Sequence, residues 1–144
     1  MPHTNPYPPP AGLAKLPPEW PSDPLPAIRE HVVTQAQSIV VLDDDPTGTQ
    51  TVFDTPVLTN WDQKHLTQEF QRGTSLFYIL TNSRSLDAEG AAQCNREIAQ
   101  ALVKARHETG RDYTVISRSD STLRGHYPLE TDVLAETLNE TEAV

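Results

Sequence analysis

Three adjacent carboxylates, Asp43, Asp44 and Asp45, follow directly after the apolar segment at residues 38–42. Neighbouring anionic side chains repel one another, so a buried strand end holds three of them only where donors, a cation or a ligand neutralise their charge. In that position they can accept hydrogen bonds from ligand hydroxyls, hold a hydrated cation or act as a base. The simpler alternative is a turn in which the aspartates cap backbone amides of their own loop.

The two residues that shape the following turn suit the same kind of site. Thr47 offers a hydroxyl group, and Gly48, which has no Cβ, lets a ligand approach the backbone closely. We therefore expect both residues to contribute to a ligand site next to the aspartates.

A second polar cluster, residues 117–125, holds four hydroxyl side chains, two arginines and one aspartate before it ends at Gly125. Arg118 and Arg124 each offer a planar guanidinium fork to a carboxylate or a phosphate. Asp120 can accept a hydrogen bond from a sugar hydroxyl or orient one of the arginines. The alternative is a helix cap formed by the Ser-Asp-Ser-Thr segment, with both arginines in solvent.

A third, smaller polar cluster contains Asn82, Ser83 and Arg84. These residue types suit ligand contact and a local turn equally well. His126 follows the second cluster directly and can also reach the site.

The segments between these clusters alternate between strand and helix patterns. The patterns predict strands at residues 38–42, 55–59, 76–80 and 113–116, and helices at 25–35, from about 62 to 72, 87–109 and 128–139. Such alternation predicts an α/β fold, a mainly parallel sheet with helices on both faces in three layers. In open sheets of this type, ligands bind outside the carboxyl ends of the strands. The three polar clusters should therefore converge on one edge of the sheet.

Composition sets the limits of the domain. Residues 1–26 hold 10 of the 13 prolines and have no apolar periodicity, so we predict an extended N-terminal arm there. Residues 27–144 then form one α/β domain. Its last predicted helix runs to the C-terminus without a closing signal, so we expect this domain to be incomplete.

The charge and the cysteine content exclude several classes of function. A net charge of −9 argues against a nucleic-acid groove or an anionic membrane surface as partner. No apolar stretch is long enough to span a membrane, and no signal peptide is evident. The only cysteine, Cys94, excludes an internal disulfide and falls on the buried side of a predicted helix. A cytoplasmic location fits these features best.

Two of the clusters resemble the motifs of the four-carbon acid sugar kinase family. Asp44-Asp45-Pro46-Thr47-Gly48 looks like its DDxTG motif, and residues 118–125, Arg-Ser-Asp-Ser-Thr-Leu-Arg-Gly, look like its long DSTLRG motif. The resemblance covers residues 39–138. Arg118 stands where many relatives have lysine, which keeps the charge, changes the geometry and leaves open which sugar acid fits.

The resemblance implies a kinase that uses ATP and Mg²⁺ to phosphorylate a threonate, erythronate or 3-oxo-tetronate at its terminal hydroxyl. In this family the N-terminal α/β domain binds the sugar acid, and a C-terminal domain supplies most of the nucleotide site. This sequence has no Gly-x-x-x-x-Gly-Lys loop and no such second domain. We therefore expect the chain alone to bind a sugar acid weakly, if at all, and not to complete phosphoryl transfer.

The predicted substrate-binding residues combine this resemblance with the chemistry of the clusters. By motif, the resemblance implies substrate contacts from Asp44, Asp45, Asp120 and Arg124. The full predicted set is Asp44, Asp45, Thr47, Gly48, Arg84, Arg118, Asp120, Ser121, Thr122, Arg124 and Gly125. No catalytic residue and no metal ligand is assigned.

Two other functions remain open from the sequence. Asp43-x-Asp45-x-Thr47 after an apolar strand also matches the first motif of haloacid-dehalogenase-type phosphatases, with Asp43 as nucleophile and Asp45 as acid/base. The strand end at residues 79–82 resembles that superfamily's second motif, but no later acidic metal pair is evident, and residues 117–125 stay unexplained. The other candidate is a noncatalytic sugar-acid-binding fragment.

Overall fold

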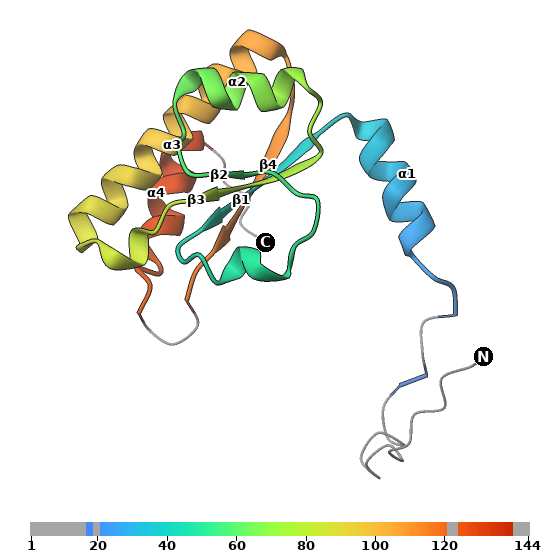
Figure 1. Ribbon diagram of the computed structural model, residues 1–144, viewed down its shortest axis with the longest axis horizontal. Helices are drawn as coiled ribbons and strands as arrows, with labels where there is room; N and C mark the ends of the chain where they lie inside the picture. The colour runs from blue at the N-terminus through green and yellow to red at the C-terminus, as the bar shows by residue number, and fades with distance from the viewer. Residues whose placement is uncertain (1–16, 19–20, 121–123, 140–144) are drawn as a thin grey trace.

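The fold is built around a four-stranded, entirely parallel sheet (Figure 1). The computed structural model describes residues 17–18, 21–120 and 124–139. Its strands are β1 (Ser38–Asp43), β2 (Val57–Leu58), β3 (Leu76–Leu80) and β4 (Tyr113–Arg118), in the spatial order β2-β3-β1-β4. The predicted α/β class with a parallel sheet is confirmed. β1 is a central strand, paired with β3 on one side and β4 on the other.

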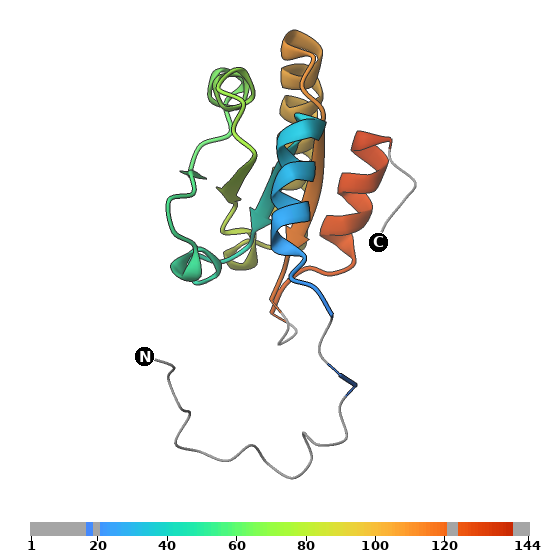
Figure 2. The ribbon, with the colours of Figure 1, turned by 90° about the vertical axis from the view of Figure 1, so that its right-hand side faces the viewer.

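The helices of the described residues are α1 (Leu25–Gln35), α2 (Gln63–Gln71), α3 (Ala88–Thr109) and α4 (Leu129–Leu138), with 3-10 turns η2 (Gly48–Thr51) and η3 (Ser83–Ser85). α3 packs against both α2 and α4, so these three form one helical layer. Figure 2 shows η2 on the other side of the strands from α2. The connection from β1 to β2 therefore passes over the face that this layer leaves uncovered.

The core lies between the sheet and this helical layer. Alternate residues of β1 and β3 point toward the helices, because successive side chains of a strand face opposite sides. Val40 and Leu42 of β1 and Phe77 and Ile79 of β3 are buried there. Phe70 of α2 packs edge-on against Phe77, with ring centroids 6.0 Å apart. Each such buried side chain stabilises the fold by about 2 kcal/mol.

α3 carries the predicted apolar face, and its two ends follow ordinary capping rules. The Asp87 carboxylate accepts a hydrogen bond from Gly90 N at 2.8 Å, and Gly110 ends the helix with φ of 69°. Cys94 is buried on this helix, and burial raises the pKa of its thiol to about 11. At neutral pH the side chain is therefore a packed thiol and not a reactive thiolate.

α1 differs from the other helices because none of its residues is buried. Figure 1 shows it extending away from the amino end of β1. Most of the predicted proline-rich arm, residues 1–16, 19 and 20, lies outside the described residues. No helix within the described ranges is both long and apolar enough to cross a membrane.

Candidate functional site

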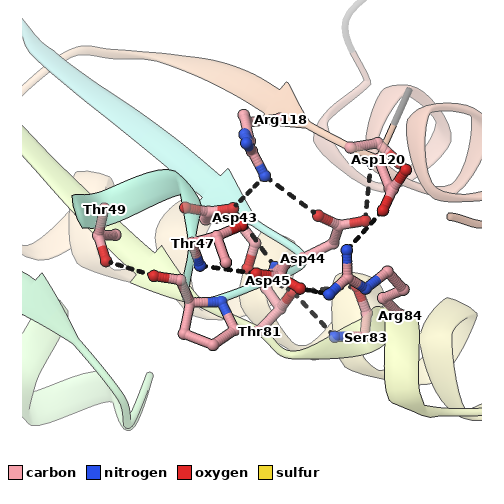
Figure 3. Close-up of polar contacts among 12 residues, drawn as sticks. Asp43, Asp44, Asp45, Thr47, Thr49, Thr81, Ser83, Arg84, Arg118 and Asp120 are labelled. Atoms are coloured by element: carbon pink, nitrogen blue, oxygen red, sulfur yellow. Dashed lines mark hydrogen bonds and ion pairs between the residues drawn. The ribbon is translucent and has the colours of Figure 1, made fainter. Parts of the chain in front are cut away.

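The carboxyl ends of β1, β3 and β4 meet at one edge of the sheet (Figure 3). The register places Asp43 of β1 opposite both Leu80 of β3 and Arg118 of β4. Backbone pairing continues beyond the strands, since Thr81 N donates to Asp43 O at 2.9 Å and Asp44 N donates to Arg118 O at 3.3 Å. The predicted convergence of the three polar clusters is therefore confirmed.

Asp43 is the most deeply buried of the three adjacent aspartates, with no exposed side-chain surface. Its Oδ1 accepts a hydrogen bond from Arg118 Nη1 at 3.2 Å, whereas its Oδ2 has no hydrogen-bond partner among the described residues. Burial raises the pKa of Asp43, and the Arg118 guanidinium acts in the opposite direction. A Cβ at Gly48 would overlap the Asp43 carboxylate, so only glycine lets the η2 segment cover this aspartate.

Asp44 joins the first cluster to the one after β4. Its Oδ2 accepts a hydrogen bond from Asp120 N at 2.9 Å, and Arg118 Nη1 lies 3.7 Å from its Oδ1. Oδ1 is buried and has no hydrogen-bond partner among the residues described. Gly125 packs against the other oxygen of this carboxylate, because a Cβ at Gly125 would lie 3.2 Å from Asp44 Oδ2 and would overlap Ser119 Oγ. Asp44 thus keeps one acceptor atom unused at the centre of the site.

Arg84 connects all three strand ends. It forms an ion pair with Asp45 and donates from Nη1 to Asp120 Oδ2 at 2.5 Å. Asp120 Oδ2 also lies 2.6 Å from Arg124 Nη2. Asp45 Oδ1 accepts a hydrogen bond from Thr47 N at 2.6 Å, as the turn-capping alternative predicts. Asp45 therefore both caps its own loop and fixes Arg84.

Burial separates the two kinds of charge at this edge. The side chains of Asp43, Asp44, Asp45 and Asp120 are at most 5% exposed, whereas those of Arg84, Arg118 and Arg124 are 26%, 43% and 63% exposed. Four carboxylates against three guanidinium groups leave one negative charge in excess. The surface nevertheless presents cationic groups outward, held from beneath by carboxylates.

This arrangement can bind a small anion that also carries hydroxyl groups. Guanidinium groups that are already oriented by carboxylates bind an incoming carboxylate with little loss of side-chain entropy. Asp44 Oδ1 is an unused acceptor, but it is buried, so a ligand donor reaches it only if the neighbouring side chains move.

A metal site is harder to build from these groups. Within the described ranges, no group of three or more histidine, cysteine, aspartate or glutamate side chains is arranged to hold a metal ion. Mg²⁺ bound mainly through nucleotide phosphates needs only one or two protein carboxylates.

The structure brings most of the predicted site residues together, with a few exceptions. Thr47 lies at the site through its backbone N–H, which donates to Asp45, while its side chain is exposed. Ser121 and Thr122 lie outside the described residues. His126 contacts the loop after η3, with Nε2 3.0 Å from Leu86 O.

Sequence reasoning missed Glu130, which forms a polar group beneath the site with the buried Thr81 and Ser83 and the half-buried Ser119. Glu130 lies in the first turn of α4, where acidic residues are common because they complement the helix dipole. Its position in the sequence therefore gives no signal that distinguishes it from an ordinary helix start.

Comparison with known proteins gives one match. A protein-family model described as "Sugar-binding N-terminal domain" matches residues 39–144, which include all of β1 but its first residue, the other three strands, α2 to α4 and the whole site. No curated protein and no solved structure matches the chain. Since the matched region is most of the sequence and contains the clustered arginines and aspartates, the chain belongs to the sugar-binding N-terminal domain family.

Proposed function

We propose that this chain is the substrate-binding part of an ATP-dependent kinase that phosphorylates a four-carbon sugar acid at its terminal hydroxyl. The substrate is of the threonate, erythronate or 3-oxo-tetronate type. The family description supports sugar binding, and the two motifs at residues 44–48 and 118–125 support the narrower assignment by resemblance.

The observation that carries this proposal is the outward presentation of the arginines over buried aspartates. Arg118 and Arg124 are the most exposed charged groups at the strand ends, and each has an aspartate that orients it. A sugar acid supplies a carboxylate for such guanidinium groups. An uncharged sugar lacks this group and should bind much less well.

Asp44 is the best candidate to accept a hydrogen bond from a substrate hydroxyl. Its Oδ1 is a buried acceptor without a hydrogen-bond partner in the described part of the chain, and such atoms are rare in folded proteins. A hydroxyl of the bound sugar acid would satisfy it. Asp45 and Asp120 also hold Arg84, in addition to the direct substrate contact that the motif implies.

The nucleotide site is assigned to a second domain. The sequence has no glycine-rich phosphate loop, and ATP with Mg²⁺ would be bound mainly by a C-terminal nucleotide-binding domain that acts as partner. When bound there, ATP supplies the transferred phosphoryl group. A cytoplasmic location, where ATP is available, belongs to the same proposal.

The phosphatase alternative needs Asp43 to act as a nucleophile. Asp43 has no exposed side-chain surface, its Oδ1 accepts from Arg118, and its Oδ2 lies under Gly48. A nucleophile must reach the phosphorus atom of its substrate, and here Arg118 pairs with one Asp43 oxygen while Gly48 covers the other, which argues against the alternative.

Binding of the sugar acid can be tested on the chain itself. We expect threonate or erythronate to give saturable shifts in a ¹H–¹⁵N NMR titration, with a Kd on the order of millimolar. Threitol, which has the same carbon chain without the carboxylate, is the matched ligand control. Arg118→Ala should weaken binding about tenfold or more, whereas Arg106→Ala, at the opposite end of the sheet, should not. Equal binding of threitol and threonate would contradict the proposal.

The kinase assignment needs a second experiment. The chain should be fused to the C-terminal nucleotide domain of a four-carbon acid sugar kinase and assayed for sugar-acid-dependent ADP release. We expect turnover from the fusion and none from the chain alone. Saturable binding without turnover in a fusion whose nucleotide domain binds ATP would favour the noncatalytic alternative.

A further inference from the structure

Glu130 is a buried carboxylate that the proposed substrate contacts do not use. It is 4% exposed and lies in the first turn of α4, beneath the strand ends. Its Oε1 accepts hydrogen bonds from Ser83 Oγ at 2.5 Å and from Asn95 Nδ2 at 3.2 Å. Its Oε2 accepts from Ser119 Oγ at 3.5 Å. All three donors are neutral side chains.

The residues that Glu130 contacts stand directly before two site residues. Ser83 precedes Arg84, and Ser119 precedes Asp120. Arg84 and Asp120 then meet at 2.5 Å above the network. A single carboxylate thus contacts both loops whose next residues form the central ion pair, closely at Ser83 and at the 3.5 Å limit of a hydrogen bond at Ser119.

The network also reaches the end of β1. Thr81 Oγ1 donates to Asp43 O at 3.0 Å and lies 3.0 Å from Ser83 Oγ. Ser83 Oγ in turn donates to Glu130. The contacts therefore run from β1 through the loop after β3 to α4, and from α4 to the loop after β4.

A carboxylate is a costly group to bury among neutral donors. Its desolvation costs free energy, which hydrogen bonds and the positive end of the α4 dipole must offset. Replacing a buried ionic group by a well-packed apolar one often leaves stability unchanged or higher, so stability alone does not explain Glu130. A group that must fix the geometry of a binding site does explain it.

We propose that Glu130 is a positioning residue that fixes the loops after β3 and β4 relative to each other, so that Arg84 and Asp120 meet in the geometry that binds the substrate. The ligand part of this inference rests on the proposed sugar-acid function. The positioning part rests on the contacts of Glu130 alone.

The test compares four forms of the whole chain: wild type, Glu130→Ala, Glu130→Gln and Glu97→Ala. Glu97 is an exposed glutamate of α3 that accepts from Gln93, so it controls for loss of a helical carboxylate. Two quantities are measured by NMR. One is hydrogen exchange of the Asp120 and Ser83 amides, and the other is the Kd for threonate.

We expect Glu130→Ala to speed exchange of the Asp120 and Ser83 amides about tenfold and to weaken threonate binding by about the same factor. The amides of Leu66 and Phe70 in α2, which lie in the core away from the network, should keep their exchange rates. Glu130→Gln keeps the shape and the Oε1 acceptor, so it should restore most of both quantities. Glu97→Ala should match wild type.

Ser83→Ala keeps the Glu130 charge and removes only its shortest contact, so it serves where Glu130→Ala does not fold. It should still speed exchange at Asp120, which Ser83 reaches through Glu130 and Ser119. Unchanged Asp120 exchange in a folded Ser83→Ala or Glu130→Ala variant overturns the inference. Exchange that rises equally in α2 also overturns it, because Glu130 would then only stabilise the fold.

The same data separate this inference from the proposed function. Wild type that binds no four-carbon sugar acid, together with the expected local change in exchange, would leave the positioning role standing. In that case only the identity of the ligand would be wrong.

Discussion

The two ends of the same sheet use arginine in opposite ways. At the amino end, Arg111 Nε donates to Ser38 Oγ at 2.9 Å, and Nη2 donates to Gln37 O at 3.3 Å and to Gly73 O at 3.1 Å. Ser38 Oγ in turn donates a hydrogen bond to Thr74 O at 2.7 Å. One cation thus satisfies three neutral acceptors from two segments and closes that end of the sheet.

At the carboxyl end, three arginines face four buried carboxylates. Two carboxylate oxygens, on Asp43 and Asp44, still have no hydrogen-bond partner among the described residues. Buried polar atoms are nearly always paired, so an end of the sheet built only for stability would resemble the amino end. The contrast indicates that the carboxyl end is arranged for a ligand.

The largest effect should come from Arg84→Ala. It leaves the buried carboxylates of Asp45 and Asp120 without their shared cation, which should lower the free energy of unfolding by about 3 kcal/mol. It should also abolish threonate binding. Urea unfolding and NMR titration measure the two effects. Arg84→Lys keeps the charge without the fork and should recover part of the stability but little of the binding.

A smaller effect is expected from Gly48→Ala. The new Cβ would overlap the Asp43 carboxylate, so the η2 segment must shift, at a cost of about 2 kcal/mol. Gly110→Ala is the control, because its Cβ meets open space and only the positive φ opposes it, at about 1 kcal/mol. Thermal and urea unfolding compare the two. Equal losses would show that Gly48 is not packed against Asp43.

Arg111→Met tests the amino end of the sheet. It removes the hydrogen bonds to Ser38, Gln37 and Gly73 but leaves no buried charge behind, so we expect a loss of about 1.5 kcal/mol. Threonate binding by the folded variant should stay as in wild type. A tenfold change in Kd would contradict the division of roles between the two ends of the sheet.

The arrangement of strands and helices could be predicted because the sequence signals are local. The strand at residues 76–80 and the helix at 25–35 have the bounds that the patterns predict, and Gly73 and Gly110 adopt the positive φ expected at helix ends. β2 is shorter than predicted, with only Val57 and Leu58 paired. β4 extends to Arg118, because its last two residues pair with β1 although they are polar. The ends of β2 and β4 thus depend on pairing between strands, which the local sequence pattern does not show.

The composition of the site could also be predicted, but not the direction of its side chains. The motifs predict that Asp45 and Asp120 contact substrate. The structure pairs them with Arg84, a residue from another strand end. Such a pair depends on register and not on spacing along the chain. The contacts of Glu130 also depend on the fold, because Ser83 lies in the loop after β3 and Ser119 lies in the loop after β4.

The smallest effect concerns the pH dependence of stability and tests the charge at the carboxyl end directly. Burial raises the pKa of Asp43 in the folded chain, with Arg118 opposing the shift. The folded state therefore holds the proton of Asp43 more tightly than the unfolded state does. The stability from this group is present below the ordinary aspartate pKa of about 3.9 and is lost as pH rises through the higher folded value.

Asp43→Asn removes that titration and keeps the size of the side chain. Relative to wild type, the variant should gain stability as pH rises from about 3 to 7, because only the wild type must ionise a buried group. Urea unfolding followed by circular dichroism at each pH gives the difference in the free energy of unfolding. If instead the wild type gains stability relative to Asp43→Asn as pH rises, the Arg118 ion pair outweighs the cost of burial. The carboxyl end of the sheet would then be as well neutralised as the amino end, and the contrast between them would lose its main support.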